Sequence, residues 1–262
     1  PVSDGSNTAT TDASGQHPLT GSVQVLFDGE QVRMLDPSFV PLSATVDDGL
    51  LAFGDIPAGL GTTAHHVQEG RDWLHAIEPG HGWLTFPTWV SPSYHGATCN
   101  GQFANGALLF ANGFPGSCDP TNQSQDIIRH EFGHGIHVGG LLGGAFDAAI
   151  SEGTADYLAA TVTGDAAIAP DFLGPGTPLR DLEPDRVYPA DFIGGVHTQG
   201  LIVGSMLWNL RSDWAASMPD GVERDDALAV RMLHYGPTYP DLAEALLAAD
   251  DDDGDLANGT PH

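Results

Sequence analysis

The pattern of apolar and polar positions changes character along the chain. Residues 21–27 and 31–35 alternate apolar and polar side chains, which predicts two short strands, and Asp28-Gly29 between them is a hairpin signal. Another short apolar run covers residues 50–53, directly after Asp47-Asp48-Gly49. The first 60 residues are therefore expected to form a small, partly irregular β segment that carries no recognisable chemistry.

Helical spacing begins at residue 62. Apolar side chains recur at helical intervals over residues 62–78 and stop before Pro79-Gly80, which predicts one helix. Residues 83–90 read as an edge or bulged strand because they contain Pro87. Residues 107–110 predict a short strand, which is either an ordinary hairpin strand or an exposed edge that an extended peptide can join.

The rest of the chain predicts mainly helices. A central helix capped by Thr121 or Ser124 should run to about His137 and stop at Gly139-Gly140. Later helices are expected at 148–163, capped by Asp147, and at 201–211, 225–235 and 241–249, with a Pro-rich irregular stretch at 165–190. The pattern indicates an α+β protein divided into residues 1–60, 61–138 and 139–262.

Composition narrows the classes of partner. The 262 residues include no lysine and only eight arginines, and the formal net charge is −27 with a pI near 4.3. Such a surface repels nucleic acid and anionic membranes. A hydrophobic content of 41% is that of a globular chain, and no apolar run is long enough to span a membrane. A chain that begins with Pro and shows no signal peptide is expected to be a processed or trimmed piece of its precursor.

Two cysteines, Cys99 and Cys118, stand 19 residues apart and are flanked by Asn-Gly and Pro-Gly turns. They could close a loop disulfide or remain two buried thiols. The acidic, lysine-free composition is typical of an extracellular protein, so the disulfide is the favoured interpretation.

The central helix contains His130-Glu131-x-x-His134. Side chains at positions i and i+4 share one face of a helix, so both imidazoles can bind one metal ion. Zinc is the default ion, and Glu131 beside it suits a base that takes a proton from water. A metzincin would need Gly at 137 and His at 140, and this chain has His137 and Gly140, so the third ligand must lie elsewhere.

The next helix offers that third ligand. Glu152 follows His134 by 18 residues, which suits a turn and a returning helix, and Asp156 lies one helical turn further on. Glu152 could bind the metal while Asp156 accepts the free N–H of a ligand histidine. The alternative is two carboxylates on a solvated helix face. His197 follows Gly194-Gly195 at the start of a helix, where it is either free to reach a cleft or serves as a capping or core residue.

Two further groups could hold ions. His65 and His66 could form a second metal site, although a packed or solvated pair is the favoured interpretation. Asp251, Asp253 and Asp255 alternate as calcium ligands can, but they do not follow the EF-hand spacing, which favours a solvated acidic segment.

Three stretches taken together resemble the gluzincin metallopeptidases, both thermolysin-like and fungalysin-like. They are His130-Glu131-x-x-His134, Ser151-Glu152-Gly153-x-x-Asp156 and Gly194-Gly195-Val196-His197. The second and third look closer to fungalysin, and the resemblance covers roughly residues 62–250. It implies a β-rich N-terminal lobe, a helical C-terminal lobe and an active site in the cleft between them.

The resemblance also implies a role for each matching residue. His130, His134 and Glu152 would be zinc ligands, Glu131 the base, Asp156 the outer partner of a ligand, and His197 the residue that stabilises the oxyanion. Arg180 looks like the arginine that grips the substrate carbonyl, and Asn100 or Asn105 could match the edge-strand asparagine that binds peptide backbone. The tyrosine that thermolysin-like enzymes carry after the second histidine is missing from residues 141–149, and Tyr188 could substitute for it.

The sequence thus predicts a secreted, monomeric zinc metalloendopeptidase that acts on peptides or proteins. Calcium is a second candidate ion. The alternatives are a zinc aminopeptidase on the same scaffold and a non-catalytic, acidic, calcium-binding surface module.

Overall fold

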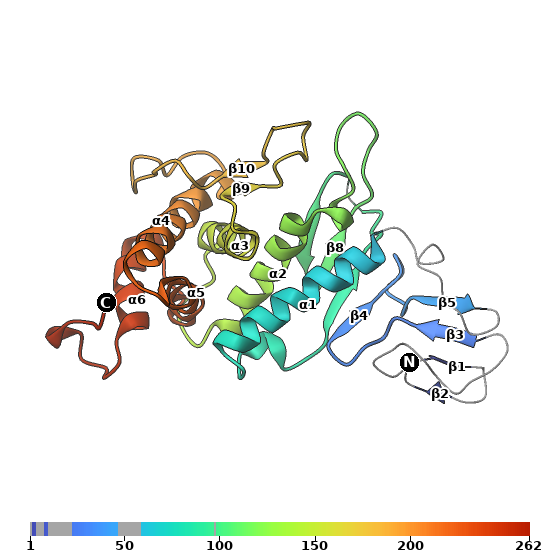
Figure 1. Ribbon diagram of the computed structural model, residues 1–262, viewed down its shortest axis with the longest axis horizontal. Helices are drawn as coiled ribbons and strands as arrows, with labels where there is room; N and C mark the ends of the chain where they lie inside the picture. Colours follow the sequence, from blue (N-terminus) through green and yellow to red (C-terminus); the bar gives the residue numbers. More distant parts are fainter. Residues whose placement is uncertain (1, 4–7, 10–22, 47–58, 97) are drawn as a thin grey trace. The chain divides into compact units, whose positions relative to one another are not determined.

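The computed structural model describes residues 2–3, 8–9, 23–46, 59–96 and 98–262 (Figure 1). The chain divides into two compact units. The first comprises residues 1–69 and 86–124, and the second comprises residues 70–85 and 125–262. Helix α1 (Leu60–Ile77) belongs to both, because the division falls between Glu69 and Gly70. The three-part division predicted from the sequence stays a prediction.

The first unit contains two four-stranded sheets. One has the order β2-β1-β3-β5 and is antiparallel throughout. Its strands are β1 (Val2–Ser3), β2 (Thr8–Ala9), β3 (Val23–Leu26) and β5 (Ser43–Val46). The other has the order β4-β6-β8-β7. Its strands are β4 (Val32–Met34), β6 (Thr88–Ser91), β7 (Gly101–Ala104) and β8 (Ala107–Phe110).

The strands predicted at 21–27 and 31–35 form as β3 and β4, but they belong to different sheets. A turn still links them, since Gly29 N donates to Val32 O and Met34 N donates to Phe27 O. The apolar run 50–53 lies outside the described residues.

Strand β8 confirms the prediction at 107–110, but it is not an edge strand. It pairs in parallel with β6 on one side and antiparallel with β7 on the other. All four of its side chains are buried, as expected of a central strand with an uninterrupted apolar run. Strand β7 is the last strand of this sheet in the order that the described residues form.

The strand predicted at 83–90 is shorter than expected. Residues Gly82–Leu84 form a 3-10 helix, η3, and β6 begins only at Thr88, directly after Pro87. Proline has no N–H for a ladder and therefore suits the position before the strand. His81 starts the 3-10 turn by accepting a hydrogen bond from Trp83 N.

The second unit is mainly helical. The short 3-10 turn η4 (Thr121–Gln123) lies at the end of the first unit. The first complete helix of the second unit is α2. The helices of this unit are α2 (Gln125–Gly140), α3 (Ala148–Thr163), α4 (Val196–Ser217), α5 (Gly221–Arg231) and α6 (Leu242–Asp250). Short elements lie between the helices or after the last one. They are η5 (Met232–Tyr235), η6 (Tyr239–Asp241), η7 (Leu256–Asn258) and a two-stranded sheet of β9 (Ala167–Ile168) and β10 (Arg180–Asp181). In Figure 1, α3 lies between α2 and α4, and it contacts both of these helices.

Glycines set how closely these helices approach. A Cβ on Gly133 of α2 would lie 2.7 Å from Ala155 Cα of α3. A Cβ on Gly153 of α3 would lie 2.2 Å from the carbonyl oxygen of Gly200 in α4. Both distances are shorter than any real contact, so only glycine permits these crossings. The close approach compensates for the low helix propensity of glycine, which is about 1 kcal/mol below that of alanine.

Helix α4 is longer than the predicted 201–211. It begins at Val196, after Gly194 in a left-handed conformation (φ 75°) and Gly195 as N-cap, and ends before Met218-Pro219. Gly200 and Gly204 do not interrupt it because they pack against α3. No helix in the described part of the chain is long and apolar enough to cross a membrane.

The predicted disulfide forms between Cys99 and Cys118, whose Cα atoms are 5.7 Å apart. It joins the segment before β7 to the segment after β8. Closing a loop of this length contributes roughly 3 kcal/mol in the chain-entropy model. Thiol titration of the denatured, unreduced protein should find no free thiol, and two free thiols would contradict the pairing.

A buried acidic pair lies between α3 and α5. Asp226 accepts hydrogen bonds from Tyr157 (2.7 Å), Thr161 (2.8 Å) and Trp73 (3.0 Å). Its neighbour Asp225 is 0% exposed. Burial is the main cause that raises the pKa of Asp225 to about 7, and the charge of Asp226 adds to it, against opposing effects of Tyr157 and Arg211.

The raised pKa of Asp225 predicts a pH-dependent stability. The folded state holds this proton more tightly than the unfolded state, so stability should fall as pH rises from about 4 through about 7. Replacement by the uncharged isostere, Asp225→Asn, should raise Tm at pH 8 by roughly 5 °C or more, and the gain should shrink toward pH 4. Thermal melts of both proteins across this range test it. An equal Tm difference at every pH would show that Asp225 does not titrate in this window.

Candidate metal centre

Helices α2 and α3 bring three metal-binding side chains together in the second unit. His130 and His134 occupy successive turns of α2, and Glu152 lies in the first turns of α3, where Asp147 caps the helix through hydrogen bonds from Ala149 N and Ile150 N. One ligand atom from each of His130, His134 and Glu152 lies within 4.8 Å of the others. The contact between Gly133 and Ala155 allows the two helices to approach this closely.

The distances fit a tetrahedral ion. His130 Nε2 lies 3.1 Å from Glu152 Oε2, and His134 Nε2 lies 3.8 Å from Glu152 Oε1. Tetrahedral bonds of about 2 Å separate two ligand atoms by roughly 3.3 Å, so the observed separations bracket the value for zinc.

Each histidine is oriented through its other ring nitrogen. Nδ1 of His130 lies 2.7 Å from Asp156 Oδ1, and Nδ1 of His134 lies 2.9 Å from Ser151 Oγ. With Nδ1 engaged, Nε2 of each ring is left to face Glu152. Outer partners of this kind fix the tautomer and ring orientation of metal ligands.

Arg180 holds Asp156 in place. Its Nε donates to Asp156 Oδ2 (2.6 Å) and one of its terminal nitrogens donates to Oδ1 (2.7 Å), a bidentate pair. Burial opposes ionisation of Asp156, but His130 and Arg180 outweigh it and hold its pKa well below the usual range. Asp156 is therefore a carboxylate near pH 7.

The two histidines have opposite pKa shifts. Burial lowers the pKa of His130, but Asp156 and Glu152 outweigh burial and raise it to about 10. Burial, and then the charge of His130, lower the pKa of His134 to about 3. The carboxylates that attract a proton to His130 attract a divalent cation in the same way, so the site favours positive charge at the shared position.

Glu131 and His197 lie beside this group. Glu131 is buried, and its Oε2 is 4.0 Å from His134 Nε2. His197 is at the start of α4, with its side chain 60% exposed and its Nε2 3.4 Å from Glu152 Oε1. The structure therefore brings six of the predicted site residues together around Glu152: His130, Glu131, His134, Asp156, Arg180 and His197.

The remaining predicted residues lie elsewhere. Asn100, whose carbonyl accepts a hydrogen bond from Ala111 N, precedes β7, and Asn105 occupies the turn between β7 and β8 with φ 52°. Both belong to the first unit, so their substrate-binding role stays a prediction. Tyr188 stacks on Tyr239 and contacts Phe192, which gives it an aromatic packing role.

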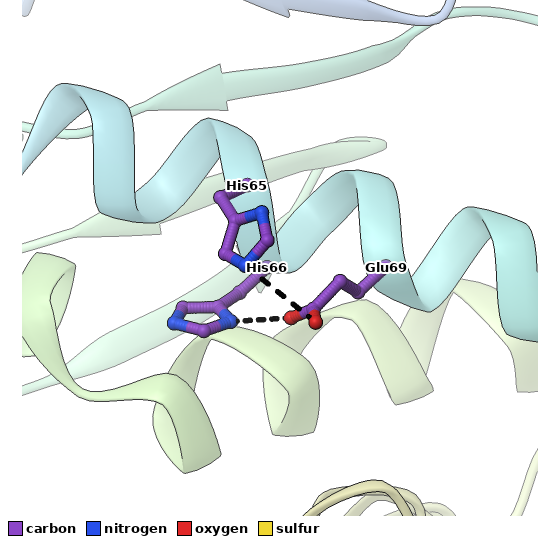
Figure 2. Close-up of side chains that lie close together, drawn as sticks. All are labelled: His65, His66 and Glu69. Atoms are coloured by element: carbon purple, nitrogen blue, oxygen red, sulfur yellow. Dashed lines mark hydrogen bonds and ion pairs between the residues drawn. The ribbon is translucent and has the colours of Figure 1, made fainter.

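The His65–His66 pair shares one carboxylate. Figure 2 shows both rings beside Glu69 on helix α1, with His65 Nε2 3.5 Å and His66 Nδ1 2.6 Å from its oxygens. His65 is exposed. The acidic run near the C-terminus is organised by local bonds, since Asp251 and Asp253 each accept from the backbone N–H two residues ahead.

Ser151 was not predicted as part of the site. It precedes Glu152 directly in α3, and its hydroxyl lies 2.9 Å from Nδ1 of His134 on α2. A serine next to a ligand carries no spacing signal of its own. Its role becomes visible only from the crossing of α2 and α3, which brings it next to His134.

Comparison with known proteins bears on the fold. No protein-family model matches the sequence, and no curated protein matches it. The solved structure of the precursor of protealysin, a metalloproteinase from Serratia proteamaculans, matches with a TM-score of 0.66. The match covers 84% of this chain and 81% of that chain, at 15% sequence identity.

This chain shares its fold with that metalloproteinase precursor. At 15% identity the likeness concerns the arrangement of the backbone, and it confirms the predicted α+β class. The closer resemblance to fungalysin-like enzymes, and the cleft between two lobes, stay predictions.

Proposed function

We propose that this protein is a secreted zinc endopeptidase. The observation that carries the proposal is the pair of histidine Nε2 atoms that face Glu152 while their Nδ1 atoms are held by Asp156 and Ser151. The metalloproteinase fold supports it. The disulfide suits an oxidising compartment, and the large net charge suits a monomer.

His130, His134 and Glu152 would hold the zinc ion. When bound, zinc supplies Lewis acidity that polarises a carbonyl oxygen and makes a water more acidic. Two imidazoles and one carboxylate would leave a fourth position open to that water, as catalytic zinc sites do.

The side chains around the ion have separate tasks. Glu131 takes the proton from the attacking water and returns it to the leaving amine. His197, exposed and next to Glu152, donates a hydrogen bond to the oxygen that becomes negative in the transition state. Asp156 orients His130, and Arg180 orients Asp156, so Arg180 acts as a positioning residue in addition to the substrate-gripping role predicted for it.

Metal removal tests the proposal. The purified protein should digest casein and an end-blocked peptide, lose both activities in 1,10-phenanthroline, and regain them when zinc is added. An aminopeptidase would leave the end-blocked peptide intact. Digestion that survives complete metal removal would overturn the proposal.

Replacement of His197 should affect turnover alone. Loss of one oxyanion donor typically lowers the rate by about 10²–10³-fold. His197→Ala should therefore lower kcat by about this factor with little change in KM, and retain the wild-type zinc content. His95→Ala, at an exposed histidine of the first unit, is the control. Loss of zinc from His197→Ala would make His197 a ligand instead.

A further inference from the structure

A second set of two histidines and one glutamate lies in the helical unit. Glu78 follows the end of α1, His81 precedes η3, and His234 lies in η5. One ligand atom from each lies within 4.8 Å of the others. Residues from two regions of sequence that are 153 positions apart thus meet in one group.

One histidine of the group is buried, and two buried polar atoms of the group have no hydrogen-bond partner among the described residues. His81 is 2% exposed, and its Nε2 has no hydrogen-bond partner among the residues that the structure describes. Oε2 of Glu78 is also buried without a hydrogen-bond partner there, although it lies 3.1 Å from His234 Nε2. A buried polar atom left without a partner is destabilising, so a ligand at this position would be stabilising.

The surroundings favour a cation. Helix α2 ends at Gly140, and a Cβ on Gly140 would lie only 2.8 Å from His81 Nε2. The group therefore faces the carbonyl end of a helix, which carries partial negative charge.

We propose that Glu78, His81 and His234 form a second zinc site with a structural role. Two imidazoles and a carboxylate are a zinc donor set. A bound ion would join the residues after α1 to η5, where Leu142 N and Gly143 N already donate to His234 O. It would thereby crosslink two segments of the unit near the end of α2.

Binding through His81 Nε2 requires one rearrangement. His81 Nδ1 accepts a 3.2 Å hydrogen bond from Trp83 N, which places the ring proton on Nε2. Metal binding moves that proton to Nδ1 and breaks this long bond. The loss of one long hydrogen bond is small beside the free energy with which structural zinc sites bind their ion.

The group of His65, His66 and Glu69 provides a comparison. His65 is exposed and Glu69 is already in contact with both rings, all on one helix (Figure 2). An ion there would bridge no separate segments. It is therefore the appropriate competitor to exclude in a test.

Zinc content tests the second site without any measurement of activity. Wild-type protein, stripped of metal and dialysed against zinc, should hold two ions, and Glu78→Gln and His234→Gln should hold one. Both variants replace partly exposed side chains by uncharged residues of similar or smaller size. Each should weaken the second site by at least the 10–100-fold typical of losing an outer partner. Zinc should also raise the Tm of a Glu152→Ala background, and the rise should disappear when Glu78→Gln is added.

Two matched controls separate this site from others. His75→Gln, at an exposed position on α1, should leave zinc content unchanged. The double variant His65→Gln/His66→Gln should also retain both ions. Unchanged zinc content and unchanged zinc-dependent Tm in Glu78→Gln and His234→Gln would overturn the proposal, as would loss of the second ion in the His65/His66 variant. A Glu152→Ala protein that keeps only the Glu78-dependent ion supports both sites independently.

Discussion

Glu152→Ala is expected to remove the ion held by His130 and His134 and to reduce peptide hydrolysis to background. Glu152 is the only carboxylate in this ligand set, and it lies 3.1 Å and 3.8 Å from the two imidazoles. Without it, the metal would have only the two imidazoles as ligands, and a proton would compete for His130 because Asp156 holds the pKa of His130 high. Both the loss of a ligand and protonation of His130 weaken metal binding.

The measurement is zinc content together with casein digestion. The variant should carry one zinc ion fewer than wild type after the same dialysis. Glu244→Ala, at an exposed glutamate in the first turn of α6, is the matched control and should behave as wild type. Full zinc retention in Glu152→Ala would remove Glu152 from the ligand set and leave the third ligand unassigned.

Local signals were sufficient to place the helices of the site. The His-Glu-x-x-His spacing and the Asp147 cap are short-range features, and α2 and α3 form where they indicate. The side chain of Asp147 accepts two hydrogen bonds from the start of α3, which fixes where that helix begins. The existence of both helices could therefore be predicted from neighbouring residues alone.

The packing of those helices was not readable from neighbouring residues. Position 153 requires glycine because the carbonyl of Gly200 passes beside it, and these residues are 47 positions apart. The same limit explains β8, whose apolar run is compatible with an edge or a central strand until its pairing with β6 is known. It also explains the Glu78, His81 and His234 group, since no motif joins residues so far apart.

Glu131→Gln is expected to keep the metal and lose turnover. Glutamine has the size of glutamate but cannot accept a proton, so the variant isolates the proton transfer from the packing. Glu131 is buried and 4.0 Å from His134, which places it beside the ligand set and not within it. Removing a positioned general base typically lowers the rate by about 10²–10⁴-fold.

The role of Glu131 is decided by measuring both kcat and zinc content in the Glu131→Gln variant. Glu131→Gln should show wild-type zinc binding, an unchanged Tm and a kcat lowered by about 10²–10⁴-fold. Glu223→Gln, at an exposed glutamate in the first turn of α5, removes the same charge from a surface that already carries a large net negative charge. It should therefore keep full activity. Loss of zinc in Glu131→Gln would make Glu131 a ligand, whereas full turnover would mean that another group takes the proton from water. In the second case Asp156 could not replace it, because both of its oxygens are bound to Arg180 and one of them also to His130.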